Sequence, residues 1–441
     1  MGESPITQMS LTGSGKKLTI CLSLFNAGKI GIVMVGLPAR GKTHLSVSLC
    51  RYLLWLGVKT RVFHLGDYRR QNLKKGEILP EDYFYINPSE KMMEFRNSVL
   101  SCCKKDIIKF FDESGQIAIY DAANPRISDR RFWASFFLKK GIQSLFIESI
   151  CDDPEIIEEN VRCLRISSPD YISWKPDDAI EDYLKRITNK IPFYETIVIN
   201  LCQKLIINNA NIGYLPSRII FYLMNIHVKP RTIYFASICD SLHDSVNLRK
   251  NCLNREDSQY ASAFVYTLLK DREEKRSLIN AGKNKNTKDL TLQIWTPILC
   301  KLCYITDLLQ NKGYIVDQRP LLRQINLGVV EDMTMEEIEE KYPTEMRLYQ
   351  ENPYTHRFPR GESLHDLGLR LESIILEIER ENNDILIIAH TSVIKLLYAY
   401  FMSTSTNEIP FLDLPSDNII KIVPGAYFCT ETRIPIVNSP S

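Results

Sequence analysis

IGIVMVGLPARGKT (30–43) is the stretch that decides the fold of the first half of this chain. Its apolar part, IGIVMV, is typical of a buried strand, and GLPARGKT then fits the pattern G-x-x-x-x-G-K-[ST]. Glycines in such a loop let backbone N–H groups converge on phosphate oxygens, and the start of the next helix adds its positive end. The stretch therefore predicts a loop that binds nucleotide phosphates between a strand and a helix.

The residues of this loop have distinct expected roles in binding ATP and Mg²⁺. Lys42 can reach the β- and γ-phosphates, and the hydroxyl of Thr43 can hold the metal. Asp121 supplies a nearby carboxylate, because it ends the apolar run IAIYD (117–121). A strand-end aspartate can also be a turn former or a helix cap, but beside a phosphate loop we expect a magnesium or catalytic role. The expected ATP ligands of the loop are Gly36, Leu37, Pro38, Ala39, Arg40, Gly41, Lys42 and Thr43.

The order of strand-like and helix-like segments predicts two α/β domains. A chain of 441 residues is too long for one ordinary hydrophobic core. Apolar strand runs alternate with helical patterns, which is typical of a parallel sheet covered by helices on both faces. SRIIFYLMNIHVKPR (217–231) reads as a helix stopped by Pro230, and the alternation restarts after it. We therefore expect a tail and a leading strand in 1–28, one domain in 29–230 and another in 231–441.

Composition excludes several classes of function. No apolar run reaches the length of about 18 residues that a membrane span needs, and the net charge of +2 gives no overall attraction to nucleic acid. Lys16 and Lys17 precede an apolar stretch that imitates a signal peptide, but a phosphate loop follows, and its chemistry is intracellular. Twelve cysteines are too few for a disulfide scaffold. The CxxC formed by Cys300 and Cys303 lacks a second ligand pair, so we expect a reduced, cytoplasmic protein.

Many stretches resemble, in order, the bifunctional 6-phosphofructo-2-kinase/fructose-2,6-bisphosphatase family. They include GLPARGKT, RYLLWLGVKTRVFHLGDYRR, FIESICDDPEII, SSPDY and YLMNIHVKPR in the first half, and MTMEEIEEKYP and RFPRGES in the second. The resemblance implies a P-loop kinase domain with a mostly parallel sheet, followed by a histidine-phosphatase-like (phosphoglycerate-mutase-like) α/β domain. It also implies a homodimer that transfers the γ-phosphate of MgATP to the 2-hydroxyl of fructose 6-phosphate.

The resemblance assigns roles that the residue pattern alone leaves open. Most arginines are solvated surface residues, but a sugar phosphate needs guanidinium clamps. Carried over by position, the fructose 6-phosphate ligands would be Arg69, Arg96, Arg130 and Arg186. A second ATP-binding stretch would run from Asn160 to Arg165. Cys151 falls at an active-site position beside the catalytic candidates Lys42 and Asp121, although a small packed thiol is an equally good interpretation.

Three positions of the first half depart from the family. Ala123 replaces a threonine expected to touch the sugar, Lys190 aligns with a sugar-binding tyrosine, and Arg165 replaces a lysine. Arginine keeps the charge of lysine but not its geometry. Because the phosphate loop is intact and the acceptor pocket is altered, we expect changed fructose 6-phosphate affinity rather than loss of ATP binding.

The second half lacks the residues that a histidine phosphatase needs. In TIYFASICDSLHDSVN (232–247), Ser241 and Leu242 align with the family's phosphate-binding arginine and nucleophilic histidine. His243 is one residue away, and in-line attack tolerates a displacement of only about 1 Å. Gln324 replaces the glutamate that acts as general acid, and an amide cannot deliver a proton. A Ser-His-Asp triad in this loop is not favoured, because triads are assembled from separate segments.

Other residues of the phosphatase pocket remain, which leaves alternatives open. Arg357, Arg360 and His390 match the family, whereas Thr391 and Lys395 stand for a glutamine and an arginine. Loss of a nucleophile alone costs on the order of a millionfold in rate, so we expect a kinase with an inactive second domain. One alternative is a pseudoenzyme that binds ATP or fructose phosphates as a regulatory module. The other is residual bisphosphatase activity through His243 or His390.

Overall fold

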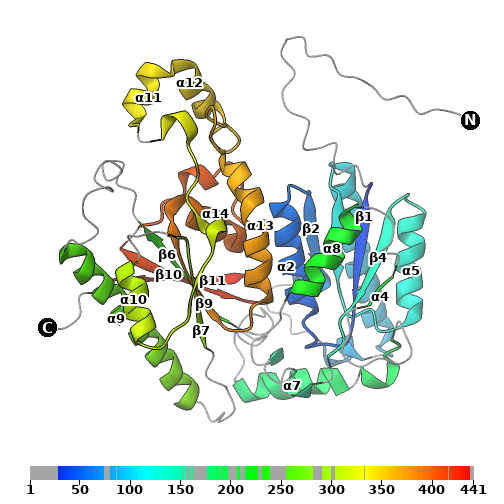
Figure 1. Cartoon of the computed structure of the whole chain (residues 1–441). Coiled ribbons are helices and arrows are strands. Elements are labelled where there is room, and N and C mark those ends of the chain that lie inside the picture. The colour runs from blue at the N-terminus through cyan, green and yellow to red at the C-terminus, as the bar shows by residue number, and fades with distance from the viewer. Residues whose placement is uncertain are drawn as a thin grey trace, which may run out of the picture.

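Two sheets, each with its own helices, organise the chain (Figure 1). The computed structural model describes residues 28–73, 80–85, 87–151, 153–154, 157, 160–161, 176–188, 190–196, 206–208, 214–226, 231–238, 255–281, 291–298, 303–331, 333–415 and 417–437. The expected leading strand before residue 28 lies outside this part of the chain. Within it, no helix is both long enough and apolar enough to span a membrane.

The first sheet has the order β2-β3-β1-β4-β5. Its strands are β1 (Ile30–Val35), β2 (Thr60–His64), β3 (Ile117–Asp121), β4 (Gln143–Glu148) and β5 (Ile206–Asn208). The first four are parallel, and β5 pairs antiparallel with β4. Every residue of the central strand β1 is buried, which explains its continuous apolar sequence. The mostly parallel sheet expected for the kinase half is confirmed.

Helices cover both faces of this sheet. Helices α2 (Lys42–Trp55) and α8 (Tyr214–Asn225) lie on one face, and α3 (Leu65–Asn72), α4 (Glu90–Asp112) and α5 (Ile127–Leu138) lie on the other. Helix α7 (Pro176–Thr188) instead packs Ile187 against Ala39 of the phosphate loop. Side chains of β1 alternate between two cores, with Val33 packed against α4 and α5, and Ile32 packed on the side of α2 and α8. The expected bounds of the helix over 217–231 were wrong: the observed helix α8 starts at Tyr214 and ends at Asn225. Proline is tolerated in a first turn, as at Pro216, and the approach to Pro230 disfavours helical backbone.

The second sheet has the order β11-β10-β6-β9-β7-β8. Strands β6 (Ile233–Ile238), β9 (Asp384–His390), β7 (Leu292–Thr296) and β8 (Val316–Gln318) are parallel. The hairpin of β10 (Asn418–Pro424) and β11 (Cys429–Pro435) joins them antiparallel to β6. The helices are α9 (Arg255–Ala281), α10 (Cys303–Asn311), α11 (Met335–Lys341), α12 (Pro343–Glu351), α13 (Leu364–Arg380) and α14 (Thr391–Met402).

One hydrophobic core joins the two units. Ile32 and Ile119 of the first sheet belong to the same buried cluster as Ile374 of α13 and Ile385 of β9. Figure 1 shows α13 and α14 beside α2 and α8, and residues of α13 contact α8 while residues of α14 contact α2. Helix α2, which follows the phosphate loop directly, is thus packed between its own sheet and the second unit.

Candidate functional site

The phosphate loop connects the buried strand β1 to the first turn of α2. Gly36 has a φ of 141°, and a Cβ atom built there would lie 2.6 Å from the carbonyl oxygen of Ser149. Gly41, directly before the helix, has a φ of 79°. Neither position accepts a side chain without strain, because both backbones lie where only glycine is unstrained. The two glycines therefore fix the path of the loop and bring the N-terminal end of α2 to its mouth.

The amino group of Lys42 is buried in this loop. Only 9% of the residue is exposed, and its Nζ donates a hydrogen bond to the Leu37 carbonyl oxygen. Burial lowers the pKa of Lys42 to about 7, because Asp121 opposes that effect only in part while Lys190 and Arg40 add to it. A buried ammonium group with this little compensation fits a phosphate anion, which would restore its ordinary charge.

Asp121 accepts two hydrogen bonds at the same carboxylate oxygen. The Thr43 hydroxyl donates to its Oδ2 at 2.8 Å, and the Nδ1 atom of His64 also lies 2.8 Å from it. Burial raises the pKa of Asp121, but His64, Lys42 and Thr43 together lower it by more than burial raises it, so the net shift is downward. A hydroxyl and an ionised carboxylate are the oxygen ligands that Mg²⁺ prefers. These residues therefore fit a magnesium ion beside the phosphates.

His64 is a member of this group that the sequence interpretation missed. It ends β2 and is the register partner of Asp121, which ends β3. Burial lowers the pKa of His64, but the hydrogen bond and the charge of Asp121 outweigh it, and the net shift is upward. Polar residues at the carboxyl ends of adjacent parallel strands meet at one edge of the sheet, and that signal was present in VFHL.

Two of the predicted sugar-phosphate arginines share one aromatic ring. Arg69 is only 6% exposed, and its guanidinium carbon lies 5.6 Å from the ring centre of Tyr83 and 5.2 Å from that of Phe84. The guanidinium of Arg96 lies 5.3 Å from the same Tyr83 ring and donates to the carbonyl oxygens of Tyr83 and Tyr85. The short turn Glu81–Phe84 thus holds both cations in place.

Lys190 connects these arginines to the phosphate loop. Its ammonium group lies 5.7 Å from the ring centre of Phe84, the ring that Arg69 also approaches. The charge of Lys190 contributes to lowering the pKa of Lys42. One continuous group of cations therefore extends from Arg96, through Arg69 and Lys190, to Lys42.

Arg130 is a buried cation near the start of α5. It is 7% exposed, and neither of its terminal nitrogens has a hydrogen-bond partner within the described ranges. Its charge opposes the upward pKa shift that burial and Glu148 impose on Tyr194, which donates its hydroxyl proton to the Glu148 carboxylate. Buried guanidinium groups normally find partners, so the open donors of Arg130 fit an anionic substrate group.

The remaining predicted residues of the first half are placed unevenly. The side-chain amide of Asn160 donates to the Ala39 carbonyl oxygen at 3.0 Å, so Asn160 supports the phosphate loop. Cys151 lies half-buried just after β4. Arg186 lies on α7, but its side chain, like the whole of Arg165, is outside the described part.

Two buried polar residues beside the loop were also missed. Glu148, fully buried at the end of β4, accepts hydrogen bonds from Tyr194 and Thr196. Asn124 donates its amide to the Met34 carbonyl oxygen at 2.7 Å. A carboxylate inside the apolar run SLFIESI was the available signal for Glu148, since buried acids are rare unless they are paired.

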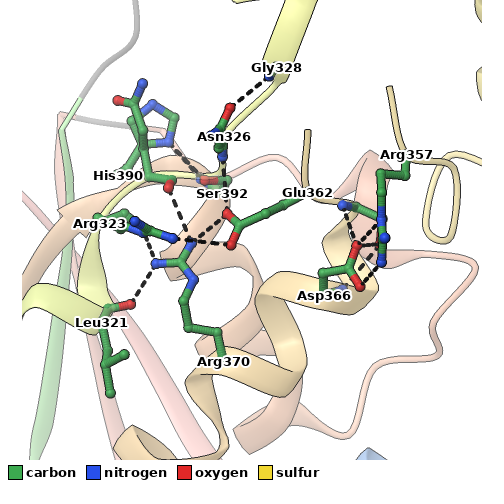
Figure 2. Close-up of polar contacts among 12 residues, drawn as sticks. Leu321, Arg323, Asn326, Gly328, Arg357, Glu362, Asp366, Arg370, His390 and Ser392 are labelled. Carbon is green, nitrogen blue, oxygen red and sulfur yellow. Dashed lines mark hydrogen bonds and ion pairs between the residues drawn. The ribbon is translucent and has the colours of Figure 1, made fainter. Parts of the chain in front are cut away.

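His390 marks the corresponding strand end in the second unit (Figure 2). Its Nδ1 atom accepts from the Ser392 amide and lies 2.9 Å from the Ser392 hydroxyl, so it caps α14. Burial lowers the pKa of His390 to about 4. The imidazole is therefore neutral at physiological pH. Ser241, Leu242 and His243 lie outside the described residues, so their relation to His390 stays a prediction.

Internal ion pairs occupy the polar residues around His390. Arg370 donates to Glu362 at 3.0 Å and to the backbone oxygens of Leu321, Arg323 and Gln324. Arg357 forms a two-pronged pair with Asp366, whose carboxylate also caps α13. Figure 2 shows His390 and Ser392 on one side of the Glu362–Arg370 group and the Arg357–Asp366 pair on the other.

Fold and site together define a P-loop phosphotransferase joined to a second α/β domain. Residues 17–230 match the family model of 6-phosphofructo-2-kinase, and residues 305–430 match that of the histidine phosphatase superfamily, branch 1. The chain belongs to the 6-phosphofructo-2-kinase/fructose-2,6-bisphosphatase family. The expected family and the expected fold of both domains are thereby confirmed.

Relatives of this family match the chain over most of its length. The human 6-phosphofructo-2-kinase/fructose-2,6-bisphosphatase 4 is 35% identical over 416 residues, covering 91% of this chain and 84% of the relative. The Saccharomyces cerevisiae protein YLR345W, provisionally assigned the same two activities, is 36% identical over 421 residues, covering 91% and 82%. Among solved structures, the alpha-ribazole phosphatase from Shigella flexneri covers 47% of this chain and 96% of its own, with 15% identity and a TM-score of 0.34. That last likeness is too weak to support an argument about function.

Proposed function

We propose that this protein is a 6-phosphofructo-2-kinase whose second domain has lost fructose-2,6-bisphosphatase activity. The observation that carries the proposal is the continuous group of cations from Arg96 and Arg69, through Lys190, to Lys42. A phosphorylated acceptor held by the arginines would have its free hydroxyl near the end of a triphosphate held by the loop. Family membership makes fructose 6-phosphate the acceptor that best fits this arrangement.

The proposed chemistry is positioning and charge neutralisation. The loop from Gly36 to Thr43 would hold the ATP phosphates, and Thr43 with Asp121 would hold Mg²⁺, which supplies further neutralisation when bound. Arg69, Arg96, Arg130 and Arg186 would hold the 6-phosphate of the sugar. Phosphoryl transfer through a loose transition state demands little covalent help from the protein, so geometry and charge account for most of the catalysis.

The proposed loss of bisphosphatase activity follows from replaced residues. Leu242 has no nucleophilic atom, Ser241 has no positive charge, and Gln324 has no proton to give. The pairing of Arg357 with Asp366 is consistent with this proposal, because the Asp366 carboxylate accepts hydrogen bonds that Arg357 could otherwise donate to a substrate phosphate. We also propose that the protein acts in the cytoplasm, since the five cysteines whose side chains the structure describes are all free thiols.

Product formation by the purified full-length protein tests the proposal. Wild type given MgATP and fructose 6-phosphate should form acid-labile fructose 2,6-bisphosphate. Lys42→Met should abolish this activity, and the matched control Lys59→Met, an exposed lysine that bonds Ser114, should not. ATP binding without product would favour the pseudoenzyme alternative instead. Absence of product from wild type, equal to that of Lys42→Met, would remove the proposed kinase function.

A further inference from the structure

Helix α13 of the second domain presents two carboxylates to helices of the first domain. Glu372 accepts a hydrogen bond from the Tyr52 hydroxyl of α2 at 2.8 Å and pairs with Arg218 of α8. Glu379 lies two helical turns further on the same face, because seven residues make about two turns of an α-helix. The two acids thus contact the first domain at two points along one helix.

Glu379 is the more deeply buried of the two acids. Its side chain is 1% exposed, and its oxygens accept from Arg51 at 2.7 Å and from Arg231 at 2.9 Å. Two tyrosine hydroxyls also donate to Glu379, that of Tyr400 at 2.7 Å and that of Tyr222 at 3.3 Å. Burial raises the pKa of Glu379, but the two guanidinium groups lower it by more than burial raises it, and the pKa falls to about 2. The residue is therefore a buried, fully hydrogen-bonded anion.

Arg51 is the partner that links Glu379 to the phosphate loop. It lies on α2, nine residues after Lys42, which is about 14 Å along a rigid helix. Its guanidinium also lies 4.9 Å from the ring centre of Tyr400 and 5.2 Å from that of Phe401, and it donates to the Cys429 sulfur. Every one of these contacts comes from the second domain. A shift of α2 at Arg51 would move the helix start, and with it the backbone that surrounds Lys42.

Packing around Arg51 makes the contact a rigid one. The ring of Tyr52 stacks on that of Tyr222 with centres 4.3 Å apart, and Leu49 and Leu53 are fully buried in the shared core. Removing one partner of a buried ion pair leaves the other charge uncompensated, and the structure then rearranges to solvate it. Because Arg51 belongs to α2, such a rearrangement would act directly on that helix.

We propose that Glu379 is a positioning residue for the kinase site, supplied by the second domain, which holds α2 and its phosphate loop in register through Arg51. The inference builds on the proposed kinase function. It assigns the second domain a part in the first reaction that is independent of its own lost chemistry. The proposed effect is mechanical, because Glu379 bonds to Arg51 of α2 rather than to residues of the phosphate loop.

Nucleotide binding to the full-length chain tests this assignment without relying on turnover. We expect Glu379→Gln to weaken the affinity for MgATP, measured by calorimetry, by about tenfold at a temperature well below unfolding. The matched control is Glu377→Gln on the same helix, whose side chain is 42% exposed and pairs with Arg319. This control should bind MgATP as wild type does. Because binding is measured directly, the result stands whether or not fructose 2,6-bisphosphate is formed.

A second variant keeps the test decisive if Glu379→Gln does not fold. Arg51→Lys retains the positive charge but loses the planar fork that reaches Glu379 and Cys429 together, and it should weaken MgATP binding several-fold. In a double-mutant cycle, Arg51→Lys and Glu379→Gln should be less than additive in their effect on MgATP affinity. Wild-type affinity in the folded variants would overturn the proposal and leave Glu379 a structural residue only.

Discussion

The Nδ1 atom of His64 lies 2.8 Å from the Oδ2 atom of Asp121, across two neighbouring strands whose ends are in register. The same oxygen accepts from Thr43. In the proposed kinase site, where Asp121 holds the metal, the hydrogen bond from His64 would fix the orientation of the Asp121 carboxylate. Groups that orient metal ligands typically matter about 10- to 100-fold for metal affinity.

His64→Ala should therefore lower the affinity of the kinase for Mg²⁺, so that the half-saturating Mg²⁺ concentration rises about tenfold at saturating ATP. The measurement is a Mg²⁺ titration of the rate, with His365→Ala of α13 as control. An unchanged half-saturating Mg²⁺ concentration in His64→Ala would show that Asp121 needs no support from His64.

Arg130→Ala should raise the KM for fructose 6-phosphate. The buried donors of Arg130 lack protein partners in the described part of the chain, and a hydrogen bond to a charged group contributes about 1.5–3 kcal/mol, or roughly 10- to 100-fold. The neighbouring Arg131 is exposed, so Arg131→Ala is the matched control. Equal KM values for the two variants in steady-state assays would argue against a sugar-phosphate site at Arg130.

Lys190→Met should lower kcat more than it changes the KM for fructose 6-phosphate. Lys190 and Lys42 bring two charges towards the same place, and loss of one reduces stabilisation of the phosphoryl group in transfer by about tenfold in rate. Lys185→Met on the exposed side of α7 serves as control. The opposite pattern, a higher KM with kcat intact, would place Lys190 in the sugar pocket instead.

Acid should unfold the protein partly by protonating Glu379. Its pKa in the folded protein is about 2, against an ordinary value of 4.5. Because the folded value is the lower one, the resulting stability is complete above 4.5 and is lost as the pH falls towards 2. The shift corresponds to about 3 kcal/mol of unfolding free energy.

Urea unfolding between about pH 3 and pH 6 measures this contribution. The stability of Glu379→Gln should depend less steeply on pH than that of wild type, while Glu377→Gln should follow wild type. Arg51, Arg231, Tyr222, Tyr400 and His44 surround the carboxylate. Burial lowers the pKa of His44 to about 4 and the charge of Glu379 opposes that shift, so His44 also titrates in this range. The comparison is therefore made in a His44→Gln background, which removes that titration. Parallel curves for wild type and Glu379→Gln would contradict the assignment.

Incubation with labelled fructose 2,6-bisphosphate should leave no phosphohistidine on the protein. We propose that Leu242 takes the place of the nucleophile, and burial lowers the pKa of His390 to about 4 while its Nδ1 contacts Ser392. His390→Ala provides the blank for any background label. Alkali-stable label on wild type that disappears in His390→Ala or His243→Ala would restore the residual-bisphosphatase alternative.

Local sequence patterns were sufficient to place the loop of residues 36–41 between β1 and α2, Asp121 at the end of β3, and most strands. IGIVMVG and IAIYD are continuous apolar runs, and such runs mark buried parallel strands without reference to any distant residue. Helix ends were less predictable. Helix α8 ends at Asn225, five residues before Pro230, and a periodic apolar pattern does not indicate how far before a proline a helix ends.

Contacts between distant segments account for what the sequence did not predict. His64 meets Asp121 through the register of β2 and β3, and Arg51 meets Glu379 through the packing of α2 on α13. Neither pair has a local signature, because both depend on how complete elements are arranged. A buried acid in an amphipathic helix such as α13 reads simply as part of its polar face.

The core that Ile32 and Ile119 share with Ile374 and Ile385 has an evolutionary consequence. Deleting the second domain would expose to water the sides of α2 and α8 that now face it, and the first domain would lose that support. We therefore expect selection to preserve the interior of the second domain even where residues outside that interior change.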